Sequence, residues 1–181
     1  LSTQTIIIAS RPNSQQVGFT KWMHVVMPES SQREVRESSR SGLSFADTYP
    51  FHLITSPSLI DLNNRILNEN LLSLCFRPNI VVEGDFPPYD EDQWDLIKIG
   101  DADFRCREWC SRCQIPTIHP FIGVRQGSEP LHTLETYRLW KQEIWFGQNI
   151  ILESGSKIKV GDPVSIMTRA GNSLAELQAQ G

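Results

Sequence analysis

The sequence lacks the features that would place it at once among membrane or nucleic-acid-binding proteins. No apolar run approaches the roughly 20 residues that a membrane-spanning helix needs. Basic residues are not in excess, because 17 Lys and Arg stand against 21 Asp and Glu, for a formal charge of −4. We therefore expect no nucleic-acid partner and no membrane span in this chain.

Nucleotide-binding glycine motifs are absent and cysteine is scarce. Neither GxGxxG nor GxxxxGK[ST] occurs in the 181 residues, so no nucleotide cradle is predicted. The four cysteines do not have the spacing of a disulfide framework in a chain of this size. This usage predicts an intracellular, reducing compartment and thiols that have a function.

Short apolar segments separated by turn residues make up most of the chain. They predict strands at 6–9, 19–27 and 76–82, and β-hairpins around Gly100-Asp101 and Gly161-Asp162. Ser56 as N-cap and Pro57 at the first helical position predict a helix over about 57–69, and Glu129-Pro130 opens a second one. Many strands with few helices predict a mainly β fold of the α+β class, with a closed or strongly curved sheet.

The composition divides the chain into three parts. The segment from Pro28 to Ser44 has almost no apolar residue and is typical of a linker or mobile loop. We interpret residues 1–43 as an N-terminal segment and linker, 44–168 as the folded domain and 169–181 as a flexible tail. Within this tail, Ser173 to Gln178 could form a short helix.

Arg77 and Asn79 are the first candidate binding residues. They lie two apart in a predicted strand, so their side chains would leave on one face and could bind a heterocycle or a phosphate. The plainer alternative, which we prefer on spacing alone, pairs Arg77 with Asp47 or Glu83 and gives Asn79 a turn-capping role.

Two further polar segments are open to an ordinary interpretation. Asp47 and Thr48 precede Tyr49-Pro50, which predicts a rigid polar loop beside a strand or a simple turn. The acidic run Asp90-Glu91-Asp92 lacks the spacing and the glycine of an EF-hand loop, and we predict that it is a solvated loop.

Three interpretations compete for the cysteine cluster. Cys106, Cys110 and Cys113 with His119 could form a tetrahedral zinc site. Buried structural thiols are the second interpretation. In the third, Cys113 is a single thiolate ligand of a redox metal, and Ser111 and Arg112 hold a ligand of that metal. Spacing alone does not separate the three.

Seven ordered motifs resemble those of the MOSC domain, the C-terminal part of molybdenum cofactor sulfurases and of the mitochondrial amidoxime-reducing component. They run from about Ser44 to Met167 and read ADTYPFHLITSPSLIDLN, FRPNIVVEG, EDQWDLIKIGD, CSRCQIPTIHPFIG, EPLHTLETYR, FGQN and GSKIKVGDPV. The resemblance implies a curved MOSC-type β-barrel over 44–168. It also makes residues 1–43 a candidate remnant of the N-terminal β-domain of such proteins, although residues 1–40 do not show its lysine- and arginine-containing pattern.

The same resemblance implies a binding site for the molybdenum–pyranopterin cofactor (Moco). It makes Cys113 the molybdenum ligand and a catalytic residue, and leaves Cys106 and Cys110 a structural or supporting role. Ser111, Arg112, Arg77 and Asn79 would bind the cofactor, Thr48 would line its pocket, and Asp47 would be the catalytic acid. Tyr49 and Asn149 depart from the amidoxime-reducing pattern, and both concern the shape of the pocket.

The implied activity is reduction of N-hydroxylated compounds such as amidoximes and hydroxylamines, in the cytoplasm or in association with mitochondria. The electrons would come from a partner protein of the cytochrome b5 or flavoprotein reductase type, because the chain has no flavin, haem or nicotinamide motif. Two alternatives remain. One is a cofactor carrier or sulfuration module of a sulfurase whose pyridoxal-phosphate domain lies on a longer chain, and the other is a zinc-stabilised binding domain.

Overall fold

The computed structural model describes residues 4–7, 49–66 and 70–180. Its strands are β1 (Gln4–Ile7), β2 (Phe51–Thr55), β3 (Ile80–Glu83), β4 (Trp94–Ile99), β5 (Ala102–Ser111), β6 (Leu139–Trp140), β7 (Glu143–Ser154) and β8 (Pro163–Arg169). Its helices are α1 (Ser56–Arg65), α2 (Leu131–Arg138) and α3 (Leu174–Gln180), with short 3₁₀ turns η1 (Ser73–Phe76), η2 (Asp90–Gln93) and η3 (Ile115–Thr117).

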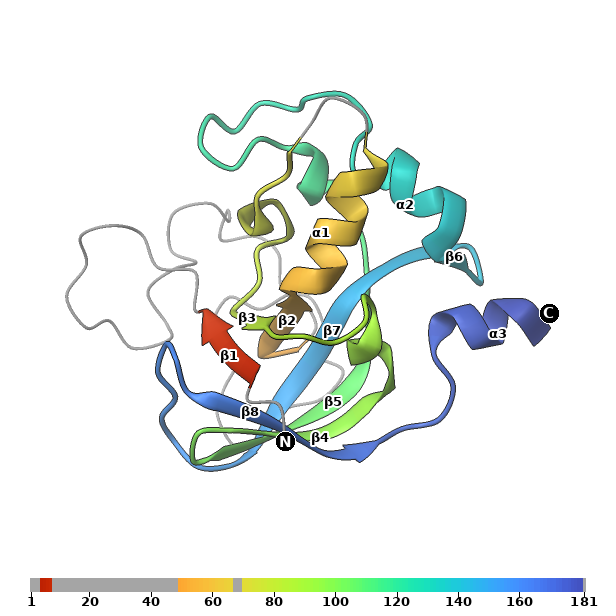
Figure 1. Cartoon of the computed structure of the whole chain (residues 1–181). Coiled ribbons are helices and arrows are strands. Elements are labelled where there is room, and N and C mark those ends of the chain that lie inside the picture. Colours follow the sequence, from red (N-terminus) through yellow and green to blue (C-terminus); the bar gives the residue numbers. More distant parts are fainter. Residues whose placement is uncertain (1–3, 8–48, 67–69, 181) are drawn as a thin grey trace.

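The strands form one curved sheet in the order β2-β3-β1-β8-β4-β5-β7-β6. An additional pairing of β2 with β7 joins distant positions in this order, so the sheet curls round on itself as a barrel. Figure 1 shows α1 and α2 next to one another above the strands, and α3 apart from them near the C-terminus. The predicted mainly β, α+β class with a curved barrel is confirmed. No described helix is both long and apolar enough to cross a membrane.

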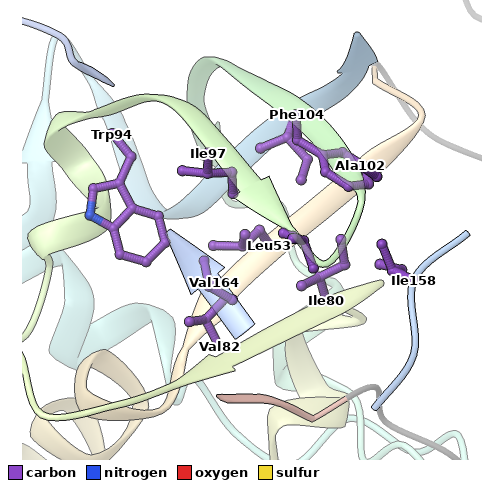
Figure 2. Close-up of a cluster of buried hydrophobic side chains, with 11 residues drawn as sticks. Leu53, Ile80, Val82, Trp94, Ile97, Ala102, Phe104, Ile158 and Val164 are labelled. Carbon is purple, nitrogen blue, oxygen red and sulfur yellow. The ribbon is translucent and has the colours of Figure 1, made fainter. Parts of the chain in front are cut away.

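The interior of the barrel is filled by apolar side chains from almost every strand (Figure 2). Burying one large aliphatic or aromatic side chain contributes roughly 1.5–3 kcal/mol, so this cluster is the main stabilising element of the fold. It consists of Leu53, Ile80, Val82, Trp94, Ile97, Ile99, Ala102, Phe104, Ile150, Ile158 and Val164.

One of the two predicted hairpins is present. The antiparallel strands β4 and β5 meet at Gly100-Asp101, and Gly100 has a φ of +53° that suits glycine. The hairpin predicted around Gly161-Asp162 is wrong, because β8 pairs with β1 and β4 and residues 157–162 contain no strand. Ile158 is instead buried in the core, and the Asp162 carboxylate accepts a hydrogen bond from the Lys159 N–H at 2.7 Å.

The first helix and the strand after it differ in detail from the prediction. The N-cap of α1 is Thr55, whose hydroxyl accepts from the Ser58 N–H at 3.4 Å, and not Ser56. The strand predicted over 76–82 begins only at Ile80, because Phe76 completes η1 and Pro78 has no N–H to give to a ladder. The predicted helix over 57–69 ends at Arg65 in the described part, and residues 67–69 lie outside it.

The remaining predicted elements can be compared where the structure describes them. The helix after Glu129-Pro130 is α2, with Leu131 and Leu134 buried. Part of the predicted strand 6–9 overlaps β1, whereas the predicted strand 19–27 and the linker 28–44 lie outside the described residues. The segment predicted as a tail forms α3, and its Leu174 is fully buried.

Candidate functional site

Cys113 lies just beyond the end of β5 and is exposed, whereas Cys75 is buried and Cys106 and Cys110 are intermediate. The Arg112 N–H donates to the Ile144 carbonyl at 2.7 Å, which holds this segment to β7 past the last residue of β5. The chain then enters η3, which contacts η1 (Figure 1). The thiol is thus on the surface, in the short segment between β5 and η3.

The Arg112 side chain joins three segments of the chain. Its Nη1 lies 3.2 Å from His52 Nε2 and 3.1 Å from Cys110 Sγ, and its Nη2 donates to the Phe76 carbonyl at 3.2 Å. Its Nε is buried and has no hydrogen-bond partner among the described residues. A buried cationic donor without a partner is costly, and an anionic ligand group at this place would offset that cost.

Arg77 and Asn79 do not lie on one strand face as predicted, because both precede β3. Arg77 is the C-cap of η1, has a left-handed φ of 54° and is exposed. Asn79 is tied to β2, since its N–H donates to the His52 carbonyl at 2.8 Å and its Oδ1 accepts from the His52 N–H at 2.7 Å. Asn79 thus does not cap a turn as in the plainer alternative, but links the segment before β3 to β2.

The structure brings most of the predicted site residues to one end of β5. Because Arg112 bonds to the carbonyl of Phe76, the segment that carries Arg77 lies directly beside the segment that carries Ser111 and Cys113. Ser111 is exposed and pairs with Trp145 of β7. We call Arg77, Asn79, Ser111, Arg112 and Cys113 the Cys113 site. The predicted Asp47 and Thr48 lie outside the described residues.

His52 belongs to the same cluster, and sequence reasoning missed it. Burial of its ring, together with the charge of Arg112, lowers the pKa of His52 to about 3. The imidazole is therefore neutral at physiological pH. The feature of the sequence that could have pointed to His52 is a single histidine within β2, whose other residues are mostly apolar.

The cysteine interpretations can now be separated in part. Burial raises the pKa of the Cys106 thiol to about 12, as expected of a structural cysteine in a strand. Cys106, Cys110, Cys113 and His119 are all described, and the described residues contain no group of three or more His, Cys, Asp or Glu that could hold a metal ion. The zinc alternative therefore has no support in this structure.

Two of the three residues of the acidic run at η2, Glu91 and Asp92, are buried, which corrects the prediction of a solvated loop. Glu91 and Asp92 are 1% and 5% exposed. Asp92 accepts two hydrogen bonds at 2.8 Å from the Arg138 guanidinium, which is itself buried. Glu91 Oε2 accepts from the hydroxyls of Thr55 and Ser58 at 3.0 and 2.9 Å, and burial followed by the nearby Asp92 raises the pKa of Glu91 to about 7.

A cavity of about 440 Å³ lies elsewhere, between α2, η2 and the start of α3. Its lining includes Arg65, Tyr89, Tyr137 and Arg138, and no residue of the Cys113 site. Many of these side chains are already bonded to one another, as in the contact of 2.7 Å between the Tyr89 and Tyr137 hydroxyls. The chemistry of the exposed thiol and the two guanidinium groups therefore directs attention to the Cys113 site instead.

The residues of the Cys113 site fit a cofactor that contains both a soft metal and anionic groups. An exposed thiol is a good ligand for a soft or redox-active metal. Arg77 is an exposed guanidinium, and Arg112 has the buried Nε that lacks a described partner. The donor set thus offers one soft ligand and two cationic groups.

Comparison with protein families decides the classification. The family model of the MOSC domain matches residues 40–165. The chain belongs to the MOSC domain family.

Several curated relatives are similar to this MOSC domain. The human mitochondrial amidoxime-reducing component 1 is 41% identical over 133 residues, which cover 69% of this chain and 39% of that protein. The mouse protein of the same name is 35% identical, over 80% of this chain and 44% of its own length. The molybdenum cofactor sulfurase of Arabidopsis thaliana is 38% identical, over 69% of this chain and 17% of that protein. The chain thus spans less than half the length of each of these relatives.

One solved structure resembles the MOSC domain more distantly. YiiM from Geobacillus stearothermophilus aligns with a TM-score of 0.49 and 13% sequence identity, over 71% of this chain and 60% of that chain.

Proposed function

We propose that this MOSC domain binds the molybdenum–pyranopterin cofactor and that Cys113 is its protein ligand to molybdenum. The observation that supports this most directly is the exposed Cys113 thiol beside Arg112, whose buried Nε has no described partner. The names of the relatives, which refer to amidoxime reduction and to the molybdenum cofactor, agree with the proposal.

Each residue of the Cys113 site has a defined task in this proposal. The Cys113 sulfur binds the metal, and the Arg77 and Arg112 guanidinium groups neutralise the anionic part of the cofactor. The Ser111 hydroxyl is an additional hydrogen-bonding group on the exposed side. Asn79 orients the segment of Arg77 through its bonds to His52. Thr48 would contact the cofactor and Asp47 would supply a proton.

The reaction that we propose is reduction of an N–OH group to N–H with release of water. It consumes two electrons and two protons, and Asp47 is the proposed donor of one proton. When bound, the cofactor supplies the two-electron redox chemistry. A partner of the cytochrome b5 or flavoprotein reductase type returns the electrons, and the names of the relatives favour association with mitochondria.

The alternative function is a carrier or sulfuration module that holds the cofactor without reducing a substrate. The similarity to a plant molybdenum cofactor sulfurase, of which this chain covers only 17%, supports this alternative. Both functions need the Cys113 site to bind the cofactor. They differ in whether an N-hydroxylated substrate is turned over.

The test starts with metal and pterin analysis of the purified protein after loading with the cofactor. We expect molybdenum in about stoichiometric amount, and a fluorescent pterin after acid oxidation. Cys113→Ala should abolish reduction of an amidoxime driven by a chemical electron donor and leave the fold intact, because the thiol is exposed. Cys110→Ala, the matched control in the same motif, should keep part of the activity.

Three outcomes would change the conclusion. A parent protein without pterin would refute cofactor binding. Equal activity of Cys113→Ala and the parent would refute the ligand assignment. Cofactor bound at Cys113 without turnover of any N-hydroxylated compound would favour the carrier or sulfuration module.

A further inference from the structure

The two halves of the Cys113 site meet at one residue of β2. Asn79, in the half that carries Arg77, exchanges two hydrogen bonds with the His52 backbone, at 2.7 and 2.8 Å. Arg112, in the half that carries Cys113, reaches the His52 side chain at 3.2 Å. His52 therefore contacts both segments, although it lies 27 residues from Asn79 and 60 from Arg112 in the sequence.

The chemistry of this contact fixes the state of the histidine. A guanidinium group can only donate hydrogen bonds, so Nε2 of His52 must be the acceptor and the ring proton must lie on Nδ1. The lowered pKa of His52, caused by burial and then by the charge of Arg112, agrees with a neutral ring. His52 thus orients a permanent cation without adding a charge of its own.

The ring of His52 occupies space that a side chain at position 147 of β7 would need. Gly147 has a φ of +81°, and a Cβ atom at this residue would lie 2.6 Å from His52 Nε2 and 2.7 Å from the Leu53 carbonyl. Only glycine leaves room for the imidazole to lie against the strand there. A side chain at position 147 would therefore displace the imidazole from its place beside Arg112.

We propose that His52 is a positioning residue of the cofactor site, which holds the Arg112 guanidinium through Nε2 and the Asn79 segment through its backbone. This inference rests on the proposed function, because positioning matters only if the Cys113 site binds a cofactor. His52 itself touches neither the metal nor the substrate. It sets the place of Arg112, and so of the segment that ends in Cys113.

The first test compares three variants in their retention of the molybdenum cofactor. His52→Leu removes the acceptor, and we expect the dissociation rate of bound pterin to rise at least about tenfold, the usual size of losing a hydrogen bond to a charged group. His52→Gln retains an acceptor and should recover most of the retention. His132→Leu, the same substitution at an exposed position of α2, should behave as the parent.

A double-mutant cycle shows whether His52 acts through Arg112. Arg112→Lys keeps the charge but loses the planar fork that reaches His52 and the Phe76 carbonyl together. The variant with both His52→Leu and Arg112→Lys should lose cofactor no faster than the worse single variant. The thermal midpoints of the apo proteins, measured in parallel, separate this effect from a general loss of folding.

The outcomes separate this inference from the proposed function. If the parent binds no pterin, the proposed function fails, and the inference fails with it. If the parent binds pterin and His52→Leu retains it equally well, only the inference is overturned. Additive effects of His52→Leu and Arg112→Lys on cofactor retention would also overturn it. If His52→Leu does not fold, the variants His52→Gln and Arg112→Lys still test the inference. Faster loss of cofactor from the double variant His52→Gln/Arg112→Lys than from Arg112→Lys alone would contradict it.

Discussion

Arginine side chains have opposite roles in the buried charge cluster at η2 and in the Cys113 site. Arg138 is 3% exposed, and its bidentate bonds to Asp92 make a closed pair inside the protein. Arg77 is exposed, and Arg112 keeps a buried Nε without a described partner. Where the protein supplies the counter-charge, an arginine stabilises the fold. Where no described carboxylate pairs with the arginine, as at Arg77 and Arg112, we propose that it binds a ligand.

Breaking the buried pair should have the largest effect on stability. Asp92→Asn removes the charge that compensates the buried Arg138 guanidinium, and we expect the free energy of unfolding to fall by about 3–5 kcal/mol. Urea denaturation at neutral pH measures this. The matched control is Asp103→Asn, which weakens a partly exposed pair with Lys98 and should change stability far less. Equal losses in the two variants would remove the distinction between buried and partly exposed charge pairs.

Glu91, the other buried carboxyl at η2, should make the free energy of unfolding depend on pH. Because the pKa of Glu91 rises from its ordinary 4.5 to about 7 on folding, the group stabilises the folded state below pH 4.5 relative to higher pH. This contribution is lost as the pH rises towards and through 7, by about 3 kcal/mol in total. Unfolding free energies of the parent and of Glu91→Gln between pH 4 and 8 should show this slope in the parent only. Parallel curves would contradict the prediction.

A substitution at the junction between the two regions should have an intermediate effect. Gly147→Ala combines a φ of +81° with contacts of 2.6 Å to His52 and 2.7 Å to Leu53, and should destabilise the protein by at least about 2 kcal/mol. The control Gly161→Ala has a φ of +88° but nothing within 4 Å of the added carbon, so only backbone strain of about 1 kcal/mol remains. Thermal unfolding of both variants tests the difference, and equal losses would show that the contact with His52 is unimportant.

The Cys113 site should respond in ligand binding and hardly in stability. Arg77 has a left-handed φ of 54°, so Arg77→Gly should relieve strain and stabilise the apo protein by up to about 1 kcal/mol. The same change should weaken retention of the molybdenum cofactor, because an anionic group loses its paired cation.

Lys141→Gly is the control for Arg77→Gly, since Lys141 is exposed and has a similar φ of 49°. It should give the gain in stability without any change in cofactor retention. If both variants retained the cofactor equally well, Arg77 would have no part in binding it.

Local patterns predicted much of the fold. The alternation of apolar residues and the turn at Gly100-Asp101 predicted the β4–β5 hairpin, because pleat and turn chemistry act between neighbours in the sequence. The same reasoning failed around Gly161-Asp162, where pairing of β8 with β1 and β4 replaces a local hairpin. Alternation of apolar and polar residues shows that a segment can form a strand, but it does not show which other strand pairs with it.

The candidate site was predictable to a similar extent. The motif that contains Ser111, Arg112 and Cys113 was identified, and the structure places the segment of Arg77 beside it. The predicted common strand for Arg77 and Asn79 was wrong, because Pro78 interrupts pairing and η1 ends at Phe76. The roles of these residues, and of Asp47 and Thr48, stay predictions.

The sequence by itself determined which segments could be strands, which side chains could bind a metal or an anion, and that these motifs follow one another as in a MOSC domain. Only the tertiary structure decided that Glu91 and Asp92 are buried and that His52 contacts Arg112. The physical reason is distance along the chain, since Arg138 lies 46 residues from Asp92 and Arg112 lies 60 from His52. The ion pair of Asp92 with Arg138 and the contact of His52 with Arg112 exist only once the barrel has brought these positions together.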